Sequence, residues 1–254
     1  ILLINMKYIF PAYSFNKYII PYPNNEHKYL MVIGEGHFKN IDNNNWNMWE
    51  KQLTDTITVP NYILEKLQLD KELKVWVEGP YNENILNINF KDLISVNRLK
   101  HIINTEQLYS RINGIDCRRY WISKIQNRLY GSNYHTITSY EHEYLYNVFK
   151  HEFKKLICHM KTHITQNSND PINIIFSKSL KLLEHEKKKY DNIIKNINNM
   201  NINNINHIRH FWAILNDVAC VYMLTRNMKA VNNIIIIGDN HAINFKKILS
   251  CFMN

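Results

Sequence analysis

The sequence predicts an α/β protein with a mostly parallel central sheet flanked by helices. Three short runs rich in apolar and β-branched residues are typical of buried strands, at 28–33 (KYLMVI), 74–77 (KVWV) and 232–238 (NNIIIIG). A largely helical connection separates the first two runs, and strand, helix and strand in succession build parallel sheets. No connecting segment is long enough to force two independent domains, so we expect a single domain over residues 1–254.

The expected helices follow from apolar residues at spacings of three and four. The segment 44–68 is expected to be helical at both ends, with Pro60 as a break between them. Ser139 is a candidate N-cap for a long helix that continues to about residue 164. The other expected helices lie at about 90–104, 178–196 and 207–228, a short element ends within 112–121, and 198–206 is expected to be a low-complexity connector.

Composition excludes several classes of protein. Hydrophobic residues make up 45% of the 254 residues, too many for a disordered chain, and no apolar run approaches the roughly 18 residues of a membrane span. The first ten residues do not fit a signal peptide, and four widely spaced cysteines favour a reduced, intracellular protein. Heavy use of Asn, Ile, Lys and Tyr is typical of an AT-rich genome, such as that of a large DNA virus.

The net charge of +9 raises the question of a nucleic-acid partner. Lysines are spread along the chain, and the densest cluster, 178–189, contains two glutamates within a helical pattern. Such a run is more often a solvated helix face than a phosphate-binding track, and no nucleic-acid-binding motif accompanies it. Nucleic acid is therefore not the expected partner, and the oligomeric state stays open.

Glycine marks the ends of the expected strands. The chain has six glycines, and five of them stand at or beside a strand end next to a charged or imidazole side chain. Two of these places share the motif Gly-x-x-His, at 34–37 (GEGH) and at 238–241 (GDNH). Glycine is used where the backbone turns sharply or approaches another group closely. The alternative is that these glycines only end strands, because motif spacing alone is weak evidence.

Four ionisable residues follow expected strands and can converge at one edge of the sheet. These are His37, Glu78, Asp116 and His241. In an open parallel sheet the residues just past the carboxyl ends of the strands point into one crevice. Two imidazoles and one or two carboxylates are the ligand set of a divalent-metal site with open positions. The same set can also act as acid and base without a metal.

The two Gly-x-x-His motifs, the strand-end Glu78 and the arginines of DCRR (116–119) resemble the TIKI/TraB, erythromycin-esterase and ChaN-like superfamily. The resemblance covers about residues 29–249. It implies two related halves in one domain, about 1–130 and about 131–254, with a shared site at the strand ends. Members include metal-dependent proteases, an esterase acting on a macrolide ring and a haem-binding protein, so the resemblance predicts a site better than a substrate.

The first hypothesis is a viral hydrolase that cleaves an ester or peptide bond in a small molecule or a peptide. His37, Glu78 and His241 would hold a divalent ion (Mn, Co or Zn) that lowers the pKa of a bound water. Glu35 and Asp239 would orient the histidines, Asp116 is a further strand-end acid, and Arg118 or Arg119 would stabilise the oxyanion.

Three alternatives remain open. Without a metal, His37 or His241 becomes the general base. The same crevice can instead bind haem or another small ligand without turnover. The chain can also be a non-enzymatic viral protein that contacts the host.

Other reactive residues have simpler interpretations. Asp217 lies on the apolar face of the expected helix 207–228, where it is either paired, with Arg118, Arg119 or Arg226 as possible partners, or aimed at a site. Cys117 is expected to be an ordinary buried cysteine rather than an activated thiolate. No serine-nucleophile elbow, complete His-Glu-x-x-His motif or nucleotide-binding loop is present, and surface positions are expected for His151, His159, His163, His207 and His210.

Overall fold

The computed structural model describes residues 8–10, 12–22, 26–36, 56–87, 94–121, 139–164, 170–195, 202–226 and 231–253. The chain forms two compact units. Unit 1 comprises Ile1–Ile115, Ala230–Ile243 and Cys251–Asn254, and unit 2 comprises Asp116–Lys229 and Asn244–Ser250. The expectation of one domain stays a prediction.

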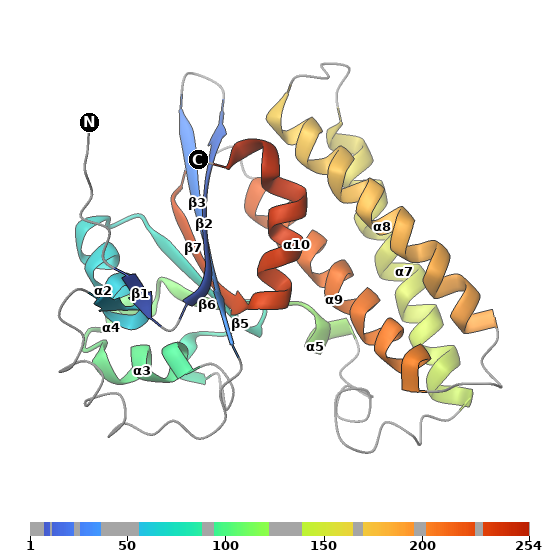
Figure 1. The fold of residues 1–254 in the computed structure, drawn as a ribbon, viewed down its shortest axis with the longest axis horizontal. Coiled ribbons are helices and arrows are strands. Elements are labelled where there is room, and N and C mark those ends of the chain that lie inside the picture. Colours follow the sequence, from blue (N-terminus) through green and yellow to red (C-terminus); the bar gives the residue numbers. More distant parts are fainter. Residues whose placement is uncertain are drawn as a thin grey trace. The chain divides into compact units, whose positions relative to one another are not determined.

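A five-stranded mixed sheet in the order β2-β3-β7-β5-β6 forms the centre of the fold (Figure 1). Strands β3 and β5 both pair with β7 in parallel, and β2 is antiparallel to β3. The predicted parallel strands ending near Ile33, Val77 and Ile237 are therefore confirmed as members of one sheet. The strands are β2 (Ala12–Pro21), β3 (His27–Glu35), β5 (Lys74–Pro80), β6 (Ile112–Asp116) and β7 (Asn233–Gly238).

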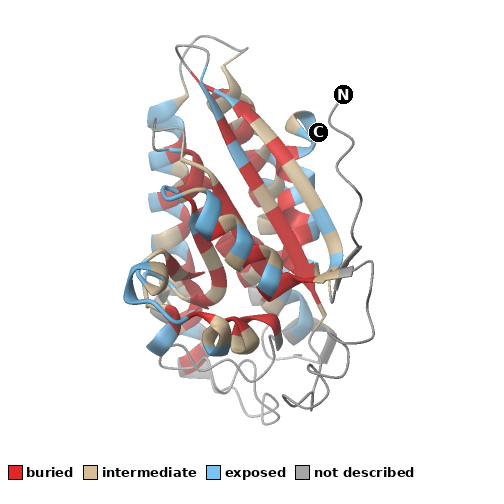
Figure 2. Ribbon diagram, turned by 90° about the vertical axis from the view of Figure 1, so that its left-hand side faces the viewer, coloured by how far each residue is buried: buried red, intermediate tan, exposed pale blue. Residues whose placement is uncertain are grey.

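Burial along the strands follows their position in the sheet. All six residues of β7 are buried, which matches its central place, whereas the edge strand β2 alternates between half-buried and exposed residues over its first half (Figure 2). The sequence analysis did not predict β2, because its polar and aromatic residues lack the continuous apolar run of a buried strand.

Helices of unit 1 cover one face of the sheet (Figure 1). They are α2 (Val59–Leu69), α3 (Ile94–Ile102) and α4 (Glu106–Tyr109), with the 3-10 turn η2 (Ile85–Asn87). Ile63 of α2 and Val96 of α3 join the core that Ile33, Val77 and Ile236 form on this face. Strands β1 (Tyr8–Phe10) and β4 (Thr56–Thr58) form a small parallel pair, and β4 is followed directly by α2 in the chain.

The start of α2 corrects one expectation. Pro60 was predicted to break the helical segment, but it stands in the first turn of α2. Proline is favoured there because its missing N–H would have no intrahelical partner. Thr58 caps the helix, since its hydroxyl accepts a hydrogen bond from Asn61 N at 3.4 Å.

Unit 2 is helical. It contains α5 (Arg118–Trp121), α7 (Ser139–His163), α8 (Pro171–Lys195), α9 (Ile202–Thr225) and the later part of α10 (Asp239–Leu249), and the 3-10 turn η5 (Ser250–Phe252) begins there. Helix α8 lies beside both α7 and α9 (Figure 1). None of the helices in the described part of the chain combines the length and apolar content that a membrane crossing needs.

Two helix boundaries differ from the expectation. Helix α8 begins at Pro171 rather than near Lys178, because Pro171 fits a first turn and Asp170 Oδ1 accepts a hydrogen bond from Ile172 N at 2.8 Å. Helix α9 begins at Ile202, so the expected connector 198–206 was wrong over its later part. Isoleucines at 202, 205 and 208 continue the helical spacing through this asparagine-rich stretch.

Arg111 closes the carboxyl end of α2. Its guanidinium donates to the backbone carbonyl of Asp70 at 2.6 Å and to that of Leu67. These carbonyls lie at the helix end, where carbonyls lack intrahelical donors and a positive charge is favourable.

We expect Arg111→Ala to lower the free energy of unfolding by about 1–3 kcal/mol, because charge-assisted hydrogen bonds to buried groups are lost. Urea unfolding should reveal this, with the exposed Lys71→Ala as a control that changes little. Equal stability of both variants would contradict the role of Arg111.

Candidate functional site

The carboxyl ends of three parallel strands lie together in unit 1. Glu35 at the end of β3 is paired with Gly238 at the end of β7, and Val77 of β5 is paired with Ile236. Because β7 lies between β3 and β5, the residues that follow β7 emerge between the ends of its two neighbours. The expected convergence of the strand ends is therefore present for β3, β5 and β7.

The pleat of the sheet places the strand-end acids on different faces. Side chains along a strand alternate between the faces. Glu35 shares a face with Ile33, which belongs to the core beneath α2 and α3. Val77 belongs to the same core, so the next residue, Glu78, points to the opposite face.

Glu78 and His241 form a pair on that opposite face. Glu78 Oε2 accepts a hydrogen bond from Gly238 N at 2.7 Å, and Glu78 Oε1 lies 3.4 Å from His241 Nε2. The Glu78 side chain is 15% exposed and that of His241 is 10% exposed. A carboxylate that is held by a backbone N–H and faces an imidazole fixes the orientation of that imidazole.

Asp239 has a partner distant in the sequence, which the sequence pattern does not indicate. Ser14 Oγ donates to Asp239 Oδ1 at 2.6 Å, and this bond joins β2 to the first turn of α10. A Cβ atom at Gly34 would come within 2.3 Å of Ser14 Oγ and 2.6 Å of Asp239 Oδ1. Gly34 is therefore needed for close approach, which is one of the two uses expected for the strand-end glycines.

Glu35 is a buried carboxylic acid with little compensation. Glu35 is 1% exposed, and neither of its carboxyl oxygens has a hydrogen-bond partner of normal geometry among the described residues. Burial raises the pKa of Glu35 to about 7, and the nearby hydroxyl and backbone N–H of Ser95 oppose this rise to a smaller extent. Glu35 is therefore a carboxyl group that changes charge near neutral pH.

Unit 2 has a separate buried polar cluster. Arg118 Nη2 and Asp116 Oδ2 form an ion pair at 2.8 Å, and Asp116 Oδ1 also accepts from Arg118 N at 2.8 Å. Asn216 Oδ1 accepts from Cys117 N at 2.8 Å. Burial raises the pKa of Cys117 to about 12, so its thiol is protonated at neutral pH, as expected for a structural cysteine.

Asp217 is buried, as expected, within the same unit. Asn244 Nδ2 donates to Asp217 Oδ2 at 2.7 Å. An arginine partner for Asp217 stays a prediction. The roles of Asn216 and Asn244, like those of Ser14 and Ser95, are not evident in the sequence, because a single Ser or Asn carries no local signal of a long-range hydrogen bond.

Some expected site residues are not among the residues that the structure describes. His37 is outside the described residues, as is the side chain of Arg119, so the joint position of His37 and His241 stays a prediction. Over the described ranges, no three His, Cys, Asp or Glu side chains are grouped so that they could hold one ion. The histidines expected at the surface are exposed, namely His151, His159, His163, His207 and His210.

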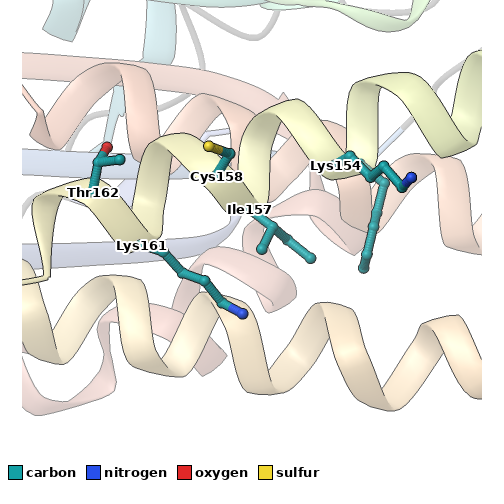
Figure 3. A pocket seen from close by; sticks show the side chains of 6 residues that line it. Lys154, Ile157, Cys158, Lys161 and Thr162 are labelled. Carbon is teal, nitrogen blue, oxygen red and sulfur yellow. The ribbon is translucent and has the colours of Figure 1, made fainter.

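Unit 2 also has a hollow beside α7. It measures about 440 Å³ and is lined along α7 by Phe153, Lys154, Ile157, Cys158, Lys161 and Thr162. Figure 3 shows Cys158 and Thr162 on one side of the helix, with Ile157 and Lys161 on the other. Its described lining includes two lysines but no carboxylate or imidazole.

Comparison of the chain with protein-family models, with curated proteins and with solved structures gave no match. The resemblance to the TIKI/TraB, erythromycin-esterase and ChaN-like superfamily therefore rests on the short motifs alone.

Glu35 predicts a pH dependence of stability. Its pKa is about 7 in the folded protein against 4.5 for the ordinary group, so the folded state binds more protons between these values. Stability should therefore fall as pH rises from 4.5 to about 7 and then level off, by a total on the order of 3 kcal/mol. Glu35→Gln removes this titration, so the variant should be more stable than wild type at pH 8. Thermal melts from pH 5 to 8, with the exposed Glu72→Gln as a control, test this, and an unchanged wild-type slope in Glu35→Gln would contradict it.

Asp217 predicts a stability effect in unit 2. Asp217→Ala leaves the buried Asn244 amide without its acceptor, so we expect a loss of about 1–3 kcal/mol and a lower melting temperature. Asp191→Ala, which removes the half-exposed partner of Lys187, should change the melting temperature much less. If Asp217→Ala leaves the melting temperature unchanged but abolishes activity, Asp217 acts in a site rather than in the scaffold.

Proposed function

We propose that the protein is a hydrolase of ester or peptide bonds whose reaction centre lies at the carboxyl ends of β3, β5 and β7. The observation that carries this proposal is the Glu78–His241 pair, with 3.4 Å between Oε1 and Nε2, at the edge where neighbouring parallel strands end. Ligands bind at such edges in open α/β sheets. The substrate is a small molecule or a peptide, and nucleic acid is not the proposed substrate.

His241 is the proposed proton acceptor. Its Nε2 faces the Glu78 carboxylate, and in the matching tautomer Nε2 carries the proton while Nδ1 accepts one. Nδ1 would take a proton from water as the water oxygen attacks the carbonyl carbon, and would return it to the leaving oxygen or nitrogen. Glu78 would stabilise the imidazolium that forms in between.

Glu78 fits a positioning role better than the ligand role first expected. Both of its oxygens already face groups of unit 1, namely Gly238 N and His241 Nε2. A carboxylate in this position raises the basicity of the imidazole and fixes its orientation. Glu35, buried on the opposite face, is not part of the proposed proton transfer.

In a second version of the proposal, the same site holds a divalent ion (Mn, Co or Zn). His37 and His241 would be its ligands, with Glu78 beside them, and the proximity of Glu78 to His241 favours this arrangement. When bound, such an ion lowers the pKa of a water and polarises a carbonyl group. The oxyanion-stabilising role expected for Arg118 stays a prediction, and Arg118 is paired with Asp116 within unit 2. The proposal also includes membership of the TIKI/TraB, erythromycin-esterase and ChaN-like superfamily and two related halves of the chain. It further includes a viral origin and an intracellular location.

A binding module is the second candidate function. His241 lies at a strand end in a largely buried position, where an imidazole can ligate haem or hold another small ligand without turnover. A Soret band that appears on adding haem and is absent in His241→Ala would favour this function. If neither hydrolysis nor ligand binding is found, the remaining candidate is a viral protein that contacts the host without catalysis.

The test compares His241→Ala, Glu78→Gln and the exposed control His185→Ala with wild type. Loss of a general base should lower the hydrolysis of nitrophenyl esters or fluorogenic peptides by about 10²–10⁴-fold in His241→Ala. Loss of the orienting carboxylate should lower it by about 10–100-fold in Glu78→Gln. Melting temperature and bound metal are measured alongside, and a chelator separates the two arrangements. Wild-type activity in His241→Ala would refute the proposed site.

A further inference from the structure

A cavity in unit 1 lies at the amino ends of the parallel strands, the edge opposite the proposed reaction centre. It measures about 240 Å³. Strand β7 begins there at Asn233 and ends at Gly238 on the other edge. The lining residues that bear on ligand binding come from β2, β3, α2, β7 and the segments beside them: Lys17, Met31, Lys66, Asp70, Leu73 and Ile234.

The inner wall of this cavity is apolar. Leu73 and Ile234 belong to the core beneath α2 and α3, and Met31 packs against that core. Tyr62 Oη donates to Met31 Sδ at 3.2 Å, which holds the thioether in place. A ligand entering the cavity would therefore bury an apolar body against these side chains.

Two ammonium groups border the cavity from different elements. Lys17 Nζ lies 5.6 Å from the centre of the Tyr29 ring, and Lys66 Nζ lies 5.3 Å from the centre of the Tyr62 ring. These cation–π contacts keep both charges near the cavity without neutralising them. Neither lysine has an ion-pair partner within the described ranges of the chain.

Among the described lining residues, the carboxylate is that of Asp70, and it already accepts hydrogen bonds. Asp70 Oδ1 accepts from Glu72 N at 2.9 Å and from Leu73 N at 3.1 Å. Asp70 Oδ2 accepts from Asn232 Nδ2 at 2.9 Å. These neutral donors stabilise the Asp70 carboxylate but leave its charge, so the ammonium groups of Lys17 and Lys66 give the described lining an excess of positive charge.

We propose that this cavity binds a small carboxylate with an apolar body, as a site separate from the reaction centre. The carboxylate would lie between the two ammonium groups and the body against the apolar wall. The volume is below the roughly 300–1,000 Å³ of pockets for drug-sized ligands, so an acid of about six carbons is suitable. The inference does not depend on the proposed hydrolase function.

Protein-observed NMR titration with hexanoate tests the proposal, with hexanamide and inorganic phosphate as comparison probes. Lys17→Met and Lys66→Met remove one charge each while keeping an apolar stem. Each should weaken hexanoate binding by about twofold to fivefold, as expected for charge pairs near the surface, and the double variant should weaken it further. Lys71→Met, an exposed lysine that does not line the cavity, is the matched control and should bind hexanoate as wild type does.

The proposal is supported if hexanoate saturates a site at the cavity residues and binds more tightly than both hexanamide and phosphate. Hexanamide binding as tight as hexanoate would show that charge is not recognised and would overturn it. If phosphate binds as tightly as hexanoate, the apolar wall does not contribute to recognition, and the proposal would be overturned. Absence of saturable binding, or an equal effect of Lys71→Met, would also overturn it.

Discussion

The pairing of β7 with two parallel neighbours is the constraint on which the architecture of unit 1 depends. Strands β3 and β5 do not pair with each other, and each is hydrogen-bonded to β7 instead. All six residues of β7 are buried, so its isoleucines supply apolar contacts to both faces of the sheet. The chain returns to this central place only at residue 233, long after β5 ends at Pro80. Closing such a non-local pairing is slow and entropically costly, and burial of the apolar strand offsets that cost.

The central place of β7 also produces the proposed reaction centre. The first turn of α10 follows β7 directly, so it emerges between the ends of β3 and β5. This brings Gly238 N and His241 to Glu78 of β5. On the other side, Asp239 meets Ser14, and the bare backbone of Gly34 leaves room for that contact. The first and last residues of the motif Gly-x-x-His at 238–241 thus meet the same carboxylate, Gly238 through its N–H and His241 through its Nε2.

The acids near the strand ends differ in how their charges are compensated. Glu78, Asp116 and Asp239 each accept a hydrogen bond from a backbone N–H or a side-chain donor. Glu35 lies on the core side of the sheet with neither oxygen in a hydrogen bond of normal geometry within the described residues. Burial without donors favours the neutral form, which is why the pKa of Glu35 rises to about 7. Similar positions at the ends of strands therefore do not imply similar hydrogen bonding of the carboxyl group.

The sequence by itself determined the α/β class, the three central strands, most of the helices and the gathering of Glu78 and His241 at one edge. These features follow from local patterns, since apolar runs, helical spacing and strand-end glycines act over a few residues. Only the tertiary structure decided that β7 lies between β3 and β5, that β2 forms the edge, and that Glu35 and Glu78 point to opposite faces. The hydrogen bonds of Ser14, Asn216 and Asn244 were likewise invisible in the sequence. Strand order, pleat and long-range hydrogen bonds depend on which distant segments pair, and a local pattern does not encode that choice.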